Sequence, residues 1–393
     1  MAGPLTGMKI LDFSTLLPGP YATLVLADLG AKVLRVSSGT RVDLAEHFPP
    51  FISEKKISAN LAWLGRNKKT MTLNLKNEKG VKIIHQLIKE YDIILEQFRP
   101  GVMDKLGLGY KDLKKINPGL IYCSLTGYGQ SGPMSMRAGH DINYISRAGL
   151  MAHSGRKNGG PVLTGMQIAD VGSGSNNAII GILAAAMHRN KTGKGQFIDI
   201  SMTDGVLAFN AMAGPVYLAS GKETEREGAL INGGTLYDFY ETKDGKYISF
   251  GGLEPQFFTN FCKVMDCQDL IEQGVMTKNL PKEKERIRNI FKTKTREQWV
   301  KAFEKTDACI EPVVSLGEAL SDPQFIERNM VVDLKMPGGG TTKQIATPIM
   351  FSETQPEYDK IGEPTGTHTK EILLELGYSE NDVDEFKKNG VFD

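Results

Sequence analysis

Short apolar segments alternate with segments of helical pattern in the first third of the chain, and this alternation constrains the fold most strongly. Strand-like apolar runs occupy residues 8–14, 31–37 and 92–98, residues 70–76 alternate between polar and apolar, and an amphipathic helix is predicted at 77–91. Strands that alternate with helices of this length are typical of βαβ units, whose parallel sheet is covered by helices on both faces. We therefore predict an α/β, Rossmann-like large domain.

The sequence changes character near residue 225. Residues 237–252 have the pattern of a β-hairpin with Asp244 and Gly245 at its turn, and a charged helix is predicted at 281–292. This pattern is that of a smaller α+β domain. The predicted large domain comprises residues 1–200 and 335–393, the linker 201–224, and the small domain 225–330.

Composition excludes several classes of function. The 393 residues carry 47 Lys and Arg against 46 Asp and Glu, a formal net charge of +1, so nothing in the charge favours nucleic acid or an anionic membrane. The four cysteines show no metal-ligand spacing, and no apolar run approaches the roughly 18 residues of a transmembrane helix. We expect a soluble cytoplasmic protein without a metal.

One glycine-rich motif, GYGQSG at 127–132, matches the dinucleotide-binding pattern G-x-G-x-x-G and follows a predicted strand. That fingerprint also requires a helix to open at the motif, so that the helix N-terminus meets the pyrophosphate. Here the next residues, PMSMRAG, contain a proline and a further glycine instead of a helical pattern. The motif therefore predicts a loop with positive φ angles and not a nicotinamide or flavin site.

Three acid–base side chains stand at unusual places. His140 lies beside Asp141 in a glycine-flanked segment that is neither clearly helical nor clearly β. Asp170 precedes two glycines and a long apolar helix, so it is either an N-cap or a carboxylate beside free backbone N–H groups that could hold an oxyanion. Glu254 follows two glycines and precedes a proline. Taken singly, each residue is compatible with a structural role.

Six stretches of the chain form a recognisable series: EQFRPGVMDKLGLGY, AGHDINYISRAG, IADVGSGS, GKGQFIDISMTDGV, INGG with the following YDFYETKDGKYISFGGLEPQFF, and TDACIEPV. In combination and in this order, they resemble the family III CoA-transferase superfamily and, within it, the alpha-methylacyl-CoA racemases. The resemblance extends over about residues 8 to 350. It implies an interlocked homodimer with long linkers, an acyl-CoA substrate, and no cofactor beyond the CoA moiety of that substrate.

The racemase likeness implies that a proton is removed from the carbon beside the thioester carbonyl and returned through an enolate. It assigns these transfers to His140 with Glu254 on one face and to Asp170 on the other. Glu254 is expected to orient the imidazole, and the backbone N–H of Asp170 is the candidate donor to the enolate oxygen. Asp141 is expected either to fix the loop through backbone hydrogen bonds or to form a local Asx-turn.

The resemblance also implies cationic contacts to the CoA phosphates and a tyrosine near the CoA chain. Where the family usually has a basic residue after the second strand, this chain has Ser37 and Ser38, so Arg35 or Arg41 is expected to compensate. The spacing after Gly233 and Gly234 is one residue shorter than usual, which leaves the size of the acyl group open. The predicted CoA-binding residues are Arg99, Arg66, Lys68, Lys69, Tyr144 and Arg35.

Three functions follow as alternatives. The first is racemisation of 2-methylacyl-CoA thioesters. The second is transfer of CoA between carboxylic acids through a mixed anhydride on Asp170. The third is acyl-CoA binding without catalysis.

Overall fold

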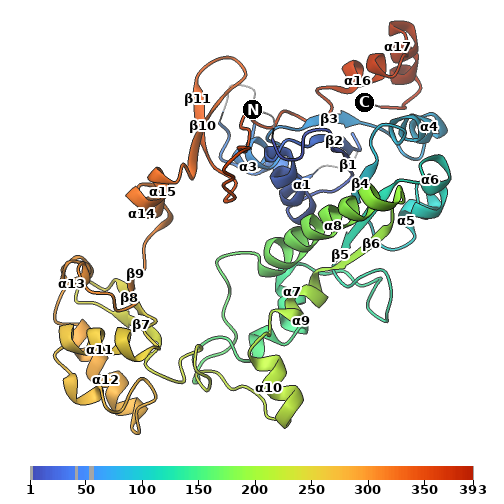
Figure 1. The fold of residues 1–393 in the computed structure, drawn as a ribbon. Coiled ribbons are helices and arrows are strands. Elements are labelled where there is room, and N and C mark those ends of the chain that lie inside the picture. The colour runs from blue at the N-terminus through green and yellow to red at the C-terminus, as the bar shows by residue number, and fades with distance from the viewer. Residues whose placement is uncertain (1–2, 40–42, 53–56, 393) are drawn as a thin grey trace. The chain divides into compact units, whose positions relative to one another are not determined.

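The chain separates into two units in the computed structural model, which describes residues 3–39, 43–52 and 57–392 (Figure 1). The large unit consists of Met1–Ala148, Thr164–Ala208 and Pro323–Asp393, and the small unit of Gly149–Leu163 and Phe209–Asp322.

A six-stranded parallel sheet forms the centre of the large unit, with strand order β3-β2-β1-β4-β5-β6. This confirms the predicted α/β class and parallel sheet. The chain runs outward from β1 in both directions, so β1 and β4 flank the switch point at which ligands bind in such sheets. The strands are β1 (Lys9–Asp12), β2 (Lys32–Ser37), β3 (Lys69–Thr72), β4 (Ile93–Glu96), β5 (Ile121–Thr126) and β6 (Phe197–Ser201).

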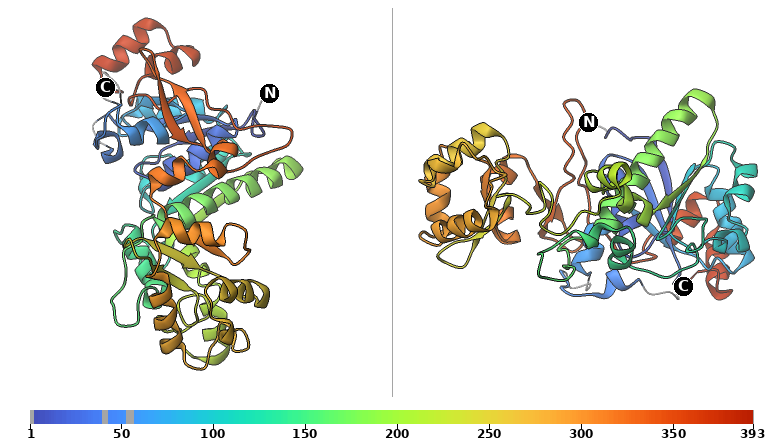
Figure 2. Two further views of the ribbon diagram at one scale, coloured as in Figure 1. Left: turned by 90° about the vertical axis from the view of Figure 1, so that its left-hand side faces the viewer. Right: turned by 90° about the horizontal axis from the view of Figure 1, so that it is seen from below.

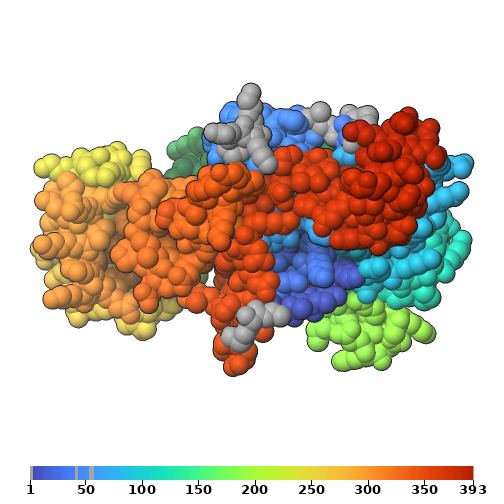
Figure 3. All heavy atoms as spheres, turned by 90° about the horizontal axis from the view of Figure 1, so that it is seen from above, coloured from blue at the N-terminus to red at the C-terminus, as the bar shows by residue number. Residues whose placement is uncertain are grey.

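Helices cover one face of this sheet and include the C-terminal segment of the chain. Every residue of β4 and β5 is buried, which explains why their sequences are mostly apolar without alternation; the buried polar exceptions are Glu96, Ser124 and Thr126. Figure 3 shows the red C-terminal helices against the cyan N-terminal ones, and both contribute to one apolar core. The helices of this face are α4 (Glu78–Leu87), α5 (Val102–Lys105), α6 (Tyr110–Ile116), α16 (Thr369–Glu375) and α17 (Glu380–Lys388).

The opposite face carries α1 (Pro18–Asp28) and α8 (Asn176–Thr192), which contact each other (Figure 2). The π-helix η2 (Ile168–Ser175) packs against both of them. Two short helices in turn pack against η2, namely α7 (Asp141–Arg147) and α9 (Met202–Ala208), and these three elements hold the candidate site. Two further helices, α2 (Leu44–His47) and α3 (Ala59–Leu64), lie between β2 and β3 in sequence. The hairpin of β10 (Val331–Lys335) and β11 (Thr341–Ile345) follows α15 (Pro323–Glu327).

An antiparallel sheet in the order β7-β8-β9 and an aromatic core define the small unit. Gly245 has a φ of 70° at the predicted hairpin turn, a conformation that suits glycine. The core stacks Phe250 on Phe261 with 4.0 Å between ring centroids and buries Trp299 against Phe291. The elements are α10 (Ala213–Ser220), β7 (Asp238–Glu241), β8 (Tyr247–Phe250), α11 (Pro255–Val264), α12 (Leu280–Phe291), α13 (Arg296–Phe303), β9 (Ile310–Pro312) and α14 (Leu316–Leu320).

In the part of the chain that the structure describes, no helix combines the length and the apolar character needed to cross a membrane.

Candidate active site

His140 stands immediately before helix α7, at the end of the loop that follows β5. Its backbone N–H donates to the side-chain Oδ1 of Asn143 at 3.0 Å, and its side chain is exposed. The helix has only seven residues, which is too short to produce a clear helical periodicity. The loop before it forms no helix, and Gly129 and Gly132 have φ angles of 80° and 86°, as the glycine-rich motif predicts.

Asp141 connects α7 to the segment that contains Asp170. Its Oδ1 accepts hydrogen bonds from the backbone N–H of Ala169 at 2.6 Å and of Asp170 at 3.0 Å. This supports the loop-fixing interpretation of Asp141 over a local Asx-turn. It contradicts the expectation that the Asp170 N–H is available to an enolate oxygen, because that donor already has a carboxylate partner.

Asp170 lies within the π-helix η2, in its first turn, and its side chain is partly buried. Burial is the largest cause that raises the pKa of Asp170, to about 6; the negative charge of Asp141 raises it further, while His140 lowers it. The hydrogen bond from the Asp170 N–H to Asp141 brings the residue next to His140 against the Asp170 segment, and the charge of His140 acts on the Asp170 carboxyl. A carboxyl group with this pKa exchanges protons readily at neutral pH.

Small residues allow η2 to fit between its neighbours. A Cβ at Gly174 would lie 2.8 Å from Cγ of Met202, and one at Gly205 would lie 2.0 Å from Oγ of Ser173. Ser175 Oγ donates to the carbonyl oxygens of Pro18 at 2.6 Å and Asp170 at 3.0 Å. The sequence therefore anchors the backbone of Asp170 to α1 through side-chain hydroxyls and close backbone packing.

Tyr144 holds the loop that precedes His140. Its buried ring is so close to Gly127 and Gly139 that a Cβ at either would lie 2.4 to 2.6 Å from a ring carbon. Its hydroxyl donates to the carbonyl oxygen of Gly139 at 2.5 Å, and burial raises its pKa to about 12. These contacts give Tyr144 a structural role beside the site.

Glu254 belongs to the small unit, whereas His140 and Asp170 belong to the large unit. It is exposed and directly precedes α11, so its carboxylate lies at the end of the helix that favours negative charge. Its charge also reaches the exposed Cys309: burial first, and then Glu254, raises the pKa of that thiol.

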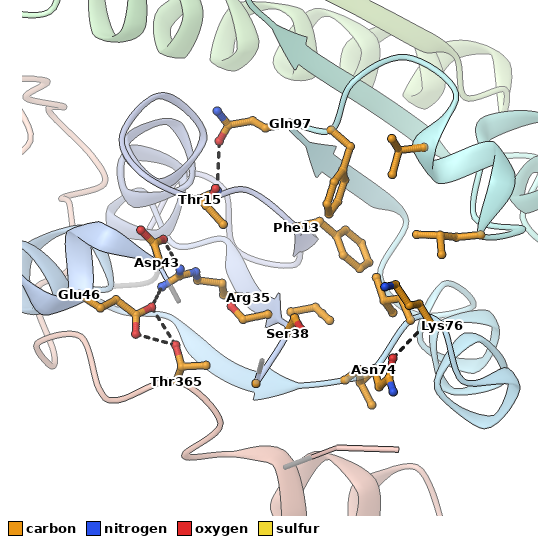
Figure 4. A pocket seen from close by; sticks show the side chains of 18 of the residues that line it. Phe13, Thr15, Arg35, Ser38, Asp43, Glu46, Asn74, Lys76, Gln97 and Thr365 are labelled. Carbon is orange, nitrogen blue, oxygen red and sulfur yellow. Dashed lines mark hydrogen bonds and ion pairs between the residues drawn. The ribbon is translucent and has the colours of Figure 1, made fainter. Parts of the chain in front are cut away.

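A cavity of about 1090 Å³ opens at the carboxyl ends of β1 to β4 in the large unit (Figure 4). Its wall includes Phe13 after β1, Ser37 and Ser38 at the end of β2, and Gln97 after β4. The sequence analysis missed Phe13 and Gln97, although their position just beyond strands next to the switch point is the usual signal for a ligand-binding residue.

Two predicted CoA contacts line this cavity. The exposed Arg99 forms no ion pair with any described residue, so its guanidinium is free for a ligand. Arg35 is 6% exposed, and its guanidinium pairs with Asp43 at 2.6 Å and Glu46 at 2.5 Å (Figure 4). Two carboxylates thus surround Arg35. Arg41, the other expected substitute, lies outside the described residues.

The basic stretch 66–69 lies elsewhere. The guanidinium of Arg66 is buried and donates to Asp28 at 3.0 and 2.6 Å, and it also contacts Gln344. Lys68 Nζ is buried and donates to Thr23 Oγ1 at 2.7 Å, and burial lowers its pKa to about 8. Lys69 pairs on the surface with two glutamates of α16. These contacts give Arg66, Lys68 and Lys69 partners within the protein.

No group of three or more His, Cys, Asp or Glu residues in ranges 3–39, 43–52 and 57–392 is arranged to hold a metal ion.

Comparison with known proteins identifies the family. The family model for CoA-transferase family III matches residues 5–369. The chain belongs to this family. It is therefore an acyl-CoA-handling enzyme. This makes the cavity and the region of His140 and Asp170 candidates for binding or converting an acyl-CoA.

Relatives divide between two activities. The chain is 34% identical to succinyl-CoA:glutarate CoA-transferase of Homo sapiens, over 99% of this chain and 90% of that protein. It is 32% identical to alpha-methylacyl-CoA racemase of Homo sapiens, over 99% of this chain and 97% of that protein. A crystal structure of a CAIB/BAIF family protein from Brucella suis superposes with a TM-score of 0.85 at 29% identity, over 96% of this chain and 100% of that one.

Proposed function

We propose that the enzyme racemises 2-methylacyl-CoA thioesters by proton transfer through an enolate. The observation that carries this proposal is the hydrogen bond that joins Asp170 to Asp141, the residue after His140; the raised pKa of Asp170, about 6, suits proton exchange at neutral pH. Racemisation needs two such groups, because one removes the α-proton while the other delivers a proton to the opposite face. A nucleophilic carboxylate alone would need no histidine.

In this mechanism the Asp170 carboxylate and the His140 imidazole alternate as base and acid on the two faces of the planar enolate. Glu254 orients the imidazole and stabilises its protonated form. Asp141 holds the Asp170 backbone in place through the two hydrogen bonds that its Oδ1 accepts. Positioned proton transfer of this kind contributes about 10²- to 10⁴-fold to the rate.

The CoA moiety is proposed to bind in the cavity beyond β1 to β4. Arg99 and Lys76 line it and can face the phosphates, while Phe13 and Phe98 offer apolar surface to the adenine ring. Arg35, held by two carboxylates, shapes the wall of this cavity.

We also propose that two chains form an interlocked homodimer. Helix α10 buries none of its residues within the described chain and exposes Val216, Tyr217 and Leu218, the last of these 86% exposed. An apolar helix of this kind calls for a partner surface. Sedimentation of the purified protein should give twice the mass of the 43.1 kDa chain; a monomer at micromolar concentration would contradict the dimer.

CoA transfer between acids is the second candidate, because a relative with this activity is as similar to the chain as the racemase. The Asp170 carboxylate would then attack the thioester carbonyl, expel CoA thiolate and form a mixed anhydride. The third alternative, an acyl-CoA binder without catalysis, would show neither reaction and would bind acyl-CoA equally well after Asp170→Asn.

The deciding experiment is proton NMR of the enzyme with (2R)- or (2S)-2-methylacyl-CoA in D₂O without an acceptor acid. Racemisation predicts loss of the α-proton signal with formation of the other epimer, and Asp170→Asn should abolish both. An unchanged α-proton, with CoA moving to an added carboxylate and hydroxylamine trapping the acyl-enzyme, would establish the transferase instead.

A further inference from the structure

Glu96 is a buried carboxylate at the carboxyl end of β4, beside the proposed CoA cavity. It is 3% exposed, and its register partner on β5 is Ser124, whose hydroxyl donates to Glu96 Oε1 in a short hydrogen bond. Glu96 Oε2 accepts the backbone N–H of Phe98 at 2.7 Å. The carboxylate thus bridges the sheet and the segment that leaves it.

That segment forms part of the cavity wall. Gln97, Phe98 and Arg99 all line the cavity, and Gln97 Oε1 accepts the backbone N–H groups of Thr15 and Gly19, each at 3.2 Å (Figure 4). Gln97 therefore ties the segment to the loop after β1. Glu96 holds the same segment through the backbone N–H of Phe98, the residue next to Arg99.

A buried carboxylate is a costly way to make these contacts. Burial raises the pKa of Glu96 to about 7, the hydrogen bonds of Ser124 and Phe98 oppose this, and the nearby charges of Asp104 and Asp199 raise the pKa further. A glutamine could accept one of the two hydrogen bonds without burying a charge. Above its pKa, however, the charged carboxylate makes roughly twice as strong a hydrogen bond as a neutral acceptor does.

We propose that Glu96 is a positioning residue of the CoA cavity, which fixes the backbone of Phe98 and thereby directs the Arg99 guanidinium toward the phosphates of CoA. This inference rests on the proposed binding of CoA in the cavity. Glu96 does not line the cavity, whereas the three residues that follow it do. The effect of replacing Glu96 should therefore depend on whether the ligand carries the phosphates that Arg99 is proposed to bind.

The test compares CoA with pantetheine, which lacks the nucleotide and its phosphates, as ligands of the wild type, Glu96→Gln, Arg99→Ala and the double variant. Glu90→Gln is the matched control, since Glu90 is an exposed surface residue paired with Lys9. We expect Glu96→Gln to weaken CoA binding about 5- to 10-fold in titration calorimetry and to leave pantetheine binding unchanged. In turnover assays the KM for acyl-CoA should rise with little change in kcat.

Because both substitutions act through one guanidinium, the double variant should bind CoA no more weakly than Arg99→Ala. Equal losses for CoA and pantetheine, or fully additive losses, would overturn the positioning role. If Arg99→Ala itself leaves CoA affinity unchanged, the proposed cavity is wrong, and the inference fails with it. If Glu96→Gln does not fold, Ser124→Ala removes one of the two donors and should give the same selective loss to a smaller extent.

Discussion

The Asp141 carboxylate accepts the backbone N–H of Asp170 at 3.0 Å. This hydrogen bond joins the residue after His140 to Asp170, which is proposed to act on the opposite face of the enolate. The same oxygen accepts the N–H of Ala169, which fixes the first turn of the π-helix. The contact also brings a negative charge beside Asp170, and this charge contributes to its raised pKa. Asp141 therefore holds the Asp170 backbone and adds to the effect of burial on the pKa of Asp170.

Replacing Asp141 with asparagine should lower the pKa of Asp170, because an amide oxygen can still accept a backbone N–H but carries no charge. The acid limb of the pH profile of kcat/KM, which requires ionised Asp170 as the base, should then move to lower pH. Exchange of the α-proton measured from pH 4.5 to 8 tests this. The exposed Asp204→Asn on α9 is the control, and an unchanged acid limb in Asp141→Asn would contradict the coupling.

Removing either proton carrier should abolish most of the turnover without preventing CoA binding. His140→Ala and Asp170→Ala are each expected to lower the rate of epimerisation at least about 10²-fold. The exposed His188→Ala on α8 should have no effect. If both variants instead lost CoA affinity to the same degree as activity, these residues would be structural.

Asp170 should also make the stability of the fold depend on pH. Its pKa is about 6 in the folded protein against 3.8 for a free side chain, so the folded state binds the proton more tightly. Stability should therefore fall as the pH rises from about 4 to 6 and stay lower above it. Asp170→Asn should raise Tm at pH 8 relative to the wild type and not at pH 4. The same gain at both pH values would point to another cause.

Arg99→Ala should weaken CoA binding about 10- to 100-fold, because a hydrogen bond to a charged group contributes roughly 1.5–3 kcal/mol. Arg99→Lys keeps the charge but loses the planar fork of donors, so it should recover only part of the affinity. Titration with CoA measures both. The exposed Arg328→Ala is the control, and a loss of equal size there would mean that net charge alone governs binding.

The Arg66–Asp28 pair should support the fold and not ligand binding. Arg66→Ala leaves Asp28 buried without its partner, which typically costs about 3–5 kcal/mol, and urea unfolding should show this loss. The double variant Asp28→Asn with Arg66→Met should recover much of the stability. If Arg66→Ala folds normally but binds CoA more weakly, that result would support the phosphate contact that the sequence predicts for Arg66.

Local sequence was sufficient to predict a strand or turn when the residues of that one segment carry the pattern typical of it. The strand after the helix at 78–87 begins with the apolar run Ile-Ile-Leu, as expected of a strand that is buried on both faces. The turn at Asp244 and Gly245 likewise needs a residue that tolerates positive φ. Motif spacing was enough for the family, which the comparison confirms.

Tertiary structure decided the partners of individual side chains. Nothing near Arg66 in sequence shows that its guanidinium meets Asp28 and Gln344, the latter 278 residues away. Within a basic run that resembles a phosphate site, this side chain is therefore part of a buried network. The short helix after His140 and the π-helix around Asp170 form because glycines and serines let neighbouring elements approach closely. Which donor is free and which carboxylate is charged depends on burial and on distant contacts, and these exist only once the chain has folded.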